Sequence, residues 1–303
     1  MRHVAVFGVL LSIVTLAYQA YSQTEEAETS SGSMQACANH GKFETTCNPF
    51  GAASVPHAID NTCGVTGDAS SNGDQAQDRQ KNNLCAKGTP RVVTMSDLKT
   101  LQNAVDKSGV DYGSTHTKPP HAGPPADRST LFAQLPAGAT REGDLVSFVG
   151  FIVEAKKGSS ETVNCHCTES PSVDVHIALA DYPLNLKEES AGASTAQKHA
   201  ITVSNDSALC TNSFVAETIP HKRPSSLELA AIEPLRNKIV KVTGPLLFDG
   251  SHRSCKGTKP GTGDPARLTV FEIHPVYDIE VCSNNSLAQC TASSNNWTSV
   301  VQH

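Results

Sequence analysis

Hydrophobic and polar residues alternate most clearly in the second half of the chain. Residues 145–153 form an apolar strand with Gly150 at its middle, where a glycine is typical of a bulge or sharp bend. Residues 173–179 alternate strictly, so their apolar side chains share one face and Asp174 and His176 share the other. The pattern also predicts strands at 162–168 (weaker), 200–203, 214–219, 238–247 and, bent at Pro275, 267–281.

Two segments have helical rather than strand-like spacing. Ser96 is the predicted N-cap of a helix whose apolar residues recur every three or four positions until Gly109 ends it. Ser225 and Glu228 have the spacing of a capping box, which predicts a short helix over 225–235 that is broken near Pro234.

Three strands, a helix and two further strands, with a long first strand bent at a glycine, follow each other in the order of the OB fold. We therefore expect a mainly β protein: an OB-like five-stranded barrel over residues 141–283 with one or two short helices. A closed barrel of this kind leaves no unpaired sheet edge.

The first 22 residues have the features of a secretory signal peptide. A short polar start with Arg2 precedes an apolar core of about 13 residues, which is shorter than the roughly 20 that a membrane helix needs. A small-residue site at 20–22 fits cleavage. The sequence thus predicts a secreted protein without a membrane span.

Between the signal peptide and the barrel the chain is polar. We expect a disordered leader at 23–35, a Cys-rich loop segment at 36–90, and a helix followed by a Pro/His-rich loop at 91–140. That loop contains His116 and His121, and its composition favours a plain linker over a weak metal site. A polar tail follows the barrel at 284–303.

Ten cysteines behind a signal peptide predict a disulfide framework, because the extracellular space is oxidising. No Cys-x-x-Cys pair of the kind that metal sites prefer is present, and the Cys-x-Cys spacing of Cys165 and Cys167 favours a different partner for each. The framework comprises Cys37, Cys47, Cys63, Cys85, Cys165, Cys167, Cys210, Cys255, Cys282 and Cys290. Sequons for glycosylation begin at Asn205, Asn284 and Asn296.

Charge and aromatic content exclude one class of partner. The formal charge is −6, or −7 once Arg2 leaves with the signal peptide, and aromatic residues make up 5% of the chain. Nucleic-acid binders usually present a basic face and aromatic stacking platforms, so this function is disfavoured.

Several ordered blocks over roughly residues 80–282 resemble a family of uncharacterised small bacterial proteins with a single OB-like domain. The blocks are NNLCAKGTP, GDLVSFVGFIVEAK, DVHIAL, AETIPHKRP, LLFDGSHRSC and FEIHPVYDIEVC. The resemblance implies the same fold, and it implies a shared cysteine framework of Cys85, Cys165, Cys210, Cys255 and Cys282. It implies no activity. The N-terminal arm and Cys290 are additions to the pattern.

These blocks contain four carboxylate–imidazole pairs: Asp174/His176, Glu217/His221, Asp249/His252 and Glu272/His274. Such pairs suit a divalent metal or general acid–base chemistry. The candidate metal ligands are Asp174, His176, Glu217 and His274, and the candidate catalytic groups are His176, Glu217 and His252. Structural alternatives remain open, since Glu217 could pair with Lys222 or Arg223 and Asp249 could cap a turn.

Two functions follow as hypotheses. The first is a secreted, non-catalytic protein that binds an extracellular polymer or mineral surface, or associates with itself, as a matrix component, including a mineralised matrix. The alternative is a metal-dependent hydrolase, for example of phosphodiesters. Motifs of serine hydrolases, zincins, kinases and dehydrogenases do not occur in the sequence.

Overall fold

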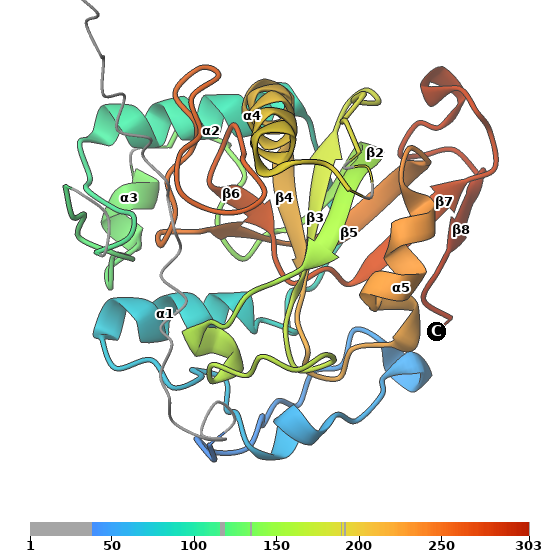
Figure 1. Cartoon of the computed structure of the whole chain (residues 1–303). Helices are drawn as coiled ribbons and strands as arrows, with labels where there is room; N and C mark the ends of the chain where they lie inside the picture. Colours follow the sequence, from blue (N-terminus) through green and yellow to red (C-terminus); the bar gives the residue numbers. More distant parts are fainter. Residues whose placement is uncertain (1–37, 116–118, 134, 189, 191, 303) are drawn as a thin grey trace, which may run out of the picture. The chain divides into compact units, whose positions relative to one another are not determined.

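Five strands close into a barrel in the computed structural model, which describes residues 38–115, 119–133, 135–188, 190 and 192–302 (Figure 1). The barrel strands are β2 (Leu145–Lys157), β3 (Val175–Ala180), β4 (Phe214–Thr218), β5 (Ile239–Phe248) and β6 (Phe271–Ile273). Their order is β2-β3-β4-β6-β5, and β5 pairs back onto β2. Only β4 and β6 run parallel among these pairs. This is the OB topology, so the predicted fold is confirmed.

Three short strands extend the barrel. Strand β1 (Arg91–Val93) lies parallel to β2, β7 (Asp278–Cys282) pairs with β5, and β8 (Trp297–Ser299) pairs with β7. The long strand predicted at 267–281 is therefore two strands, β6 and β7, with the predicted bend at Pro275 between them. The C-terminal segment is more than a polar tail, since it supplies β8.

The helices differ more from the predictions. Helix α2 (Met95–Ser108) begins at the N-cap Thr94, two residues before the predicted Ser96, because the Thr94 and Asp97 side chains form the capping box. Gly109 ends α2 in the left-handed region, as predicted. The Cys-rich segment 36–90 is not only loop, since it contains α1 (Asn72–Lys81). The short helices α3 (Ser129–Ala133) and α5 (Leu229–Ile232) lie further along the chain.

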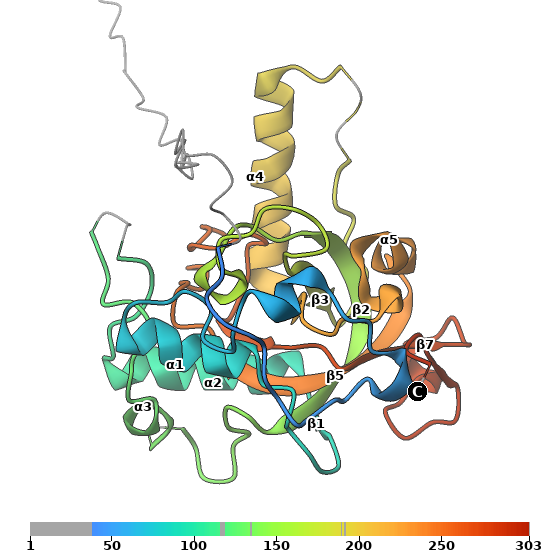
Figure 2. The same ribbon diagram turned by 90° about the horizontal axis from the view of Figure 1, so that it is seen from below.

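The strand prediction at 200–203 was wrong, because these residues lie in the 18-residue helix α4 (Thr195–Asn212). Ser194 and Gln197 form a capping box that starts α4, and the buried Leu209 and Cys210 anchor its last turn on the barrel. Figure 2 shows α4 projecting away from the strands. A capped helix with one anchored end thus overrides the β preference of the Ile-Thr-Val run.

The weaker strand prediction at 162–168 was also wrong. This segment contains a single 3₁₀ turn (Thr162–Asn164), and Cys165 and His166 follow with φ of 53° and 54°. Two consecutive left-handed residues cannot continue an extended strand. The predicted capping box at Ser225 does not form either, since Glu228 pairs with Arg223 instead.

The barrel interior is aromatic and aliphatic. Phe148 and Phe214 meet edge to face with ring centroids 4.8 Å apart, and Phe248 and Phe271 do so at 5.5 Å. All six residues of β3 are buried, because other parts of the chain cover the outer face of the barrel at this strand. Polar side chains on that outer face are therefore enclosed as well.

Disulfides connect the N-terminal arm and the loops to the barrel. Cys165 bonds to Cys63, and Cys167 also lies in a disulfide, so these neighbours do not bond to each other, as predicted. The described bonds are Cys47–Cys85, Cys63–Cys165, Cys210–Cys255 and Cys282–Cys290. Such a framework is typical of proteins in an oxidising compartment.

Some predictions fall outside the described residues. These are the signal peptide, the leader, Cys37 and His116. Within the described ranges, no helix combines the length and the apolar character needed to cross a bilayer.

Tyr277 joins the N-terminal arm to the barrel through two hydrogen bonds. Its hydroxyl donates to the Asn83 carbonyl at 2.6 Å and accepts from the Ala86 N–H at 3.1 Å. We expect Tyr277→Phe to lower the free energy of unfolding by about 1–3 kcal/mol, because it leaves these two backbone groups unpaired. Chemical denaturation measures this loss. The exposed Tyr182 provides the control, and an equal loss in Tyr182→Phe would contradict the assignment.

Candidate metal centre

The candidate site lies on the outer face of the barrel, where β3 and β4 pair. His176 of β3 is opposite Glu217 of β4 in the strand register, and alternation points both side chains away from the apolar interior. His176 is 6% exposed and Glu217 is 2% exposed. The outer face of these two OB strands commonly carries the ligand, but here it is enclosed.

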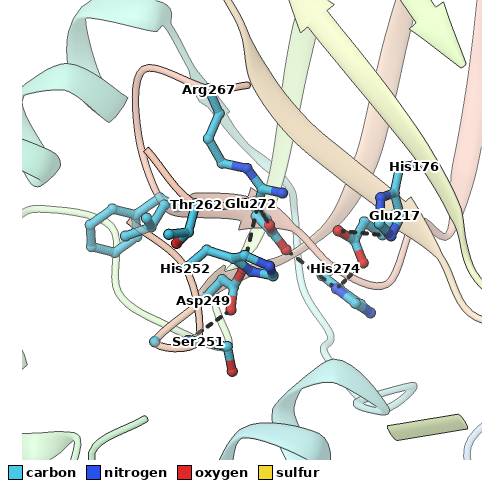
Figure 3. Close-up of polar contacts among 12 residues, drawn as sticks. His176, Glu217, Asp249, Ser251, His252, Thr262, Arg267, Glu272 and His274 are labelled. Atoms are coloured by element: carbon cyan, nitrogen blue, oxygen red, sulfur yellow. Dashed lines mark hydrogen bonds and ion pairs between the residues drawn. The ribbon is translucent and has the colours of Figure 1, made fainter. Parts of the chain in front are cut away.

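Four of the predicted ligands meet at this place. A carboxylate oxygen of Asp174, a carboxylate oxygen of Glu217 and a ring nitrogen of His274 all lie within 4.8 Å of one another. His176 Nε2 lies 3.6 Å from Glu217 Oε1, and His274 Nδ1 lies 3.3 Å from Glu217 Oε2. Asp174 directly precedes β3 and His274 directly follows β6, so three strands position the four residues. Figure 3 shows Glu217 between the two imidazoles. We call Asp174, His176, Glu217 and His274 the centre.

Several atoms of the centre have no hydrogen-bond partner among the described residues. They are both carboxylate oxygens of Asp174, Glu217 Oε2, and the Nε2 atoms of His176 and His274. A buried polar atom without a partner costs about 1–3 kcal/mol, so such atoms are rare in folded proteins. Five of them in one cluster indicate that it is built to hold something other than protein atoms.

Each histidine uses one ring nitrogen and leaves the other unpartnered. His176 Nδ1–H donates to the Asp264 carbonyl at 2.7 Å, and His274 Nδ1 lies 3.4 Å from Glu272 Oε2. His176 has the arrangement of a metal-ligating histidine, because a hydrogen bond from Nδ1 orients the ring and leaves the lone pair of Nε2 free beside Glu217. In His274 the nitrogen beside Glu217 is Nδ1 itself.

Negative charge exceeds fixed positive charge around the centre. The buried carboxyls of Asp174, Glu217, Asp249 and Glu272, together with Glu161, outnumber the permanent cations that act on them, which are Lys81, Arg267 and, at Asp174, Arg223. Burial, followed by the charges of Glu161 and Glu217, raises the pKa of Asp174 well above its usual range. Burial alone would raise the pKa of Glu217, but the imidazoles of His176 and His274 outweigh it and lower the pKa to about 2. An additional cation would relieve this imbalance.

A chain of ion pairs leads from the centre toward solvent. Glu272, beside His274, pairs with the buried Arg267, and Arg267 Nη1 lies 3.4 Å from Asp249 Oδ2. Asp249 also holds His252 Nδ1 (Figure 3). His252 is thus one step removed from the centre. The predicted turn cap is present too, because Asp249 Oδ1 accepts the Ser251 N–H at 3.1 Å.

Lys81 and Glu161 are two further charged residues beside the centre, and the sequence analysis did not predict either of them. Lys81 Nζ lies 2.5 Å from Glu161 Oε2, and Glu161 Oε1 lies 3.8 Å from His176 Nε2. Burial would lower the pKa of Lys81, but Glu161 and the other nearby carboxylates outweigh it and raise the pKa well above the usual value. Lys81 could have been noticed in the sequence because it directly precedes the block NNLCAKGTP.

Two predicted partners of Glu217 lie elsewhere. His221 Nδ1 bonds to Asp60 Oδ1 at 2.9 Å, and its ring stacks on Phe43 with centroids 3.9 Å apart. Arg223 pairs with Glu228 at 2.7 Å. The open alternative of a surface ion pair of Glu217 with Lys222 or Arg223 was therefore wrong, because Glu217 is buried and Lys222 Nζ lies 3.4 Å from the Thr45 carbonyl oxygen.

A scan against protein-family models and searches of curated proteins and of solved structures gave no match to this chain. The resemblance to the bacterial OB-like family therefore stays a prediction. Function is inferred from the chemistry of the centre, in which two imidazoles and two carboxylates can coordinate a cation or exchange protons.

Gly158 lies against the centre at the end of β2. A Cβ atom there would lie 2.9 Å from His176 Nε2 and 3.0 Å from the Asp174 carbonyl oxygen. We expect Gly158→Ala to displace the loop or the imidazole and to lower the free energy of unfolding by about 1–3 kcal/mol. Chemical denaturation tests this, with the neighbouring exposed Ser159→Ala as control. Equal stability of the two variants would refute the close contact.

His221 makes stability depend on pH. Burial, only partly opposed by the hydrogen bond to Asp60, lowers the pKa of His221 below 6.5. The unfolded chain thus takes up this proton first, and the stabilisation is lost as pH falls below about 6.5. We expect the free energy of unfolding to drop less between pH 7.5 and 5.5 in His221→Gln than in the wild type. The exposed His199→Gln should keep the wild-type slope, and a wild-type slope in His221→Gln would contradict the prediction.

Proposed function

We propose that this chain is a secreted, non-catalytic extracellular protein whose OB-like barrel binds one divalent cation at the centre. The supporting observation is the cluster of enclosed, unpartnered ligand atoms on Asp174, His176, Glu217 and His274. The bound cation would connect β3, β4 and the end of β6 and would stabilise the barrel, as structural metals do.

The donor set favours a borderline cation. Two imidazole nitrogens and two carboxylates suit Zn²⁺ best, with Mn²⁺ and Fe²⁺ next, whereas Ca²⁺ and Mg²⁺ prefer oxygen alone. Thiolate ligands are not offered by the described cysteines, which are in disulfides. Asp174, Glu217 and His274 offer ligand atoms within 4.8 Å of one another, and His176 would have to move toward them to complete a four-coordinate site.

Enclosure favours a structural cation over a catalytic one. A catalytic metal keeps an open position for water and substrate, whereas all four residues of the centre are at most 6% exposed. A surface pocket of about 500 Å³ is lined by other residues, among them Pro171, Glu228 and Glu233. The metal-dependent hydrolase is therefore the second candidate, supported by the ligand set and weakened by its burial.

The extracellular role is the less specific part of the proposal. The disulfide framework fits an oxidising compartment, and a crosslinked acidic barrel suits a matrix protein that binds a polymer or mineral surface, or itself. Glycosylation at Asn205, Asn284 and Asn296 belongs to the same proposal.

Metal analysis tests the centre. We expect secreted, purified protein to retain about one divalent cation per chain after dialysis against a mild chelator. We expect Asp174→Asn to lose the cation, because it removes a charged ligand. Cation at a hundredfold excess over Kd adds about 2.7 kcal/mol to the free energy of unfolding. This increment, measured by thermal denaturation with and without added Zn²⁺, should vanish in Asp174→Asn.

The control is Asp181→Asn, since Asp181 follows β3 directly as Asp174 precedes it, but is exposed. It should keep the cation and the increment. The stabilities of the cation-free forms distinguish a ligand from a merely structural carboxyl. Asp174→Asn replaces a buried carboxyl that has no hydrogen-bond partner by an amide of the same size, so it should be at least as stable as the cation-free wild type. A folded wild type that retains no cation would overturn the proposal. Chelator-sensitive phosphodiester hydrolysis would instead establish the second candidate.

A further inference from the structure

Two elements lie against the His176 side of the centre. One is the loop 158–174 between β2 and β3, and the other is α1. We call them the roof. In OB folds this loop, between the first two barrel strands, is one of those that commonly contact a ligand. The apolar barrel interior lies on the opposite side of β3, so a cation reaches the centre from the outer face of the barrel, where the roof lies.

The loop begins and ends at the centre. Gly158 N–H donates to the Asp174 carbonyl at 2.8 Å, so the two ends of the loop are hydrogen-bonded to each other. The Cys63–Cys165 disulfide ties its middle to the N-terminal arm. The loop is therefore fixed at its base and its middle, and Glu161 lies between these two points.

Lys81 and Glu161 form the direct ion pair between the two parts of the roof. Lys81 is the last residue of α1 and is 3% exposed. Its ammonium lies 2.5 Å from Glu161 Oε2, while Glu161 Oε1 faces His176 Nε2 at 3.8 Å. The Glu161 side chain is 19% exposed, so this pair lies where the enclosed centre meets solvent.

We infer that the Lys81–Glu161 ion pair is the latch that controls exchange of the cation at the centre, and this inference rests on the proposed function. While the pair is closed, the loop stays on α1 and the cation is retained. When the pair opens, the loop between Gly158 and Cys165 lifts from His176 and the cation exchanges with solvent. Glu161 is thus a positioning residue of the roof rather than one of the ligands.

Release kinetics test the latch. Zn²⁺-loaded full-length protein is mixed with excess chromogenic chelator, and the rate of Zn²⁺ transfer is followed by absorbance. We expect Glu161→Gln to release Zn²⁺ at least tenfold faster than the wild type, with about one Zn²⁺ still bound per chain at the start. A carboxamide keeps the size of the side chain and an acceptor for Lys81 but removes the charge.

The matched control is Glu280→Gln. Glu280 pairs with Lys241 across β5 and β7 at 2.7 Å, and its side chain is 21% exposed, close to the value for Glu161. It has no contact with the roof, so its release rate should equal that of the wild type. Lys81→Met is the second variant and should release Zn²⁺ faster as well.

Three other results for Glu161→Gln and one for the wild type would each overturn the inference, and each has a different meaning. A wild-type release rate in Glu161→Gln would show that the ion pair does not limit exchange. Slower release would show that Glu161 carries the cation outward instead of closing the roof. Complete loss of Zn²⁺ in Glu161→Gln would make Glu161 a ligand. A wild type that binds no Zn²⁺ would overturn the proposed function, and the inference with it.

Discussion

The double pairing of β2 is the constraint on which the rest of the structure depends. This strand pairs with β3 along its second half and with β5 along its first half, and so closes the barrel. Its register with β3 shifts between Ile152 and Glu154, as at a β-bulge. Gly150 allows the end of β3 to approach closely, because a Cβ there would lie 2.3 Å from the Ala180 carbonyl oxygen. Closure fixes the register of β3, and the register brings His176 opposite Glu217.

Burying so many ionisable groups on the outer face of β3 and β4 is energetically unfavourable. Oppositely charged side chains beside several of these groups offset this. Arg267 pairs with both Asp249 and Glu272, and Lys81 pairs with Glu161. Both carboxylate oxygens of Asp174, and Oε2 of Glu217, have no hydrogen-bond partner among the described residues. The remaining imbalance is concentrated at the four residues of the centre, which is why a cation is the simplest completion of the site.

The disulfides and the roof depend on one another. An OB barrel by itself leaves the outer face of its second and third strands open to ligands. Here Cys63–Cys165 holds the loop 158–174 to the N-terminal arm, and α1 from the same arm supplies Lys81. Additions outside the barrel thereby change an open ligand face into an enclosed one, which favours retention of a small cation over recognition of a large ligand.

Alternating strands and the order of elements were sufficient to predict the OB barrel, and the number of cysteines behind a predicted signal peptide was sufficient to predict a disulfide framework, although not its connectivity. The same spacing placed Asp174 and His176 on one face. Sequence alone could not place α4 or Lys81, since α4 is anchored by contacts distant in the chain and Lys81 reaches Glu161 across 80 residues. The tertiary structure also decided that His274 joins the centre while His221 does not. Burial and long-range register determine those contacts, and neither is encoded in residue spacing.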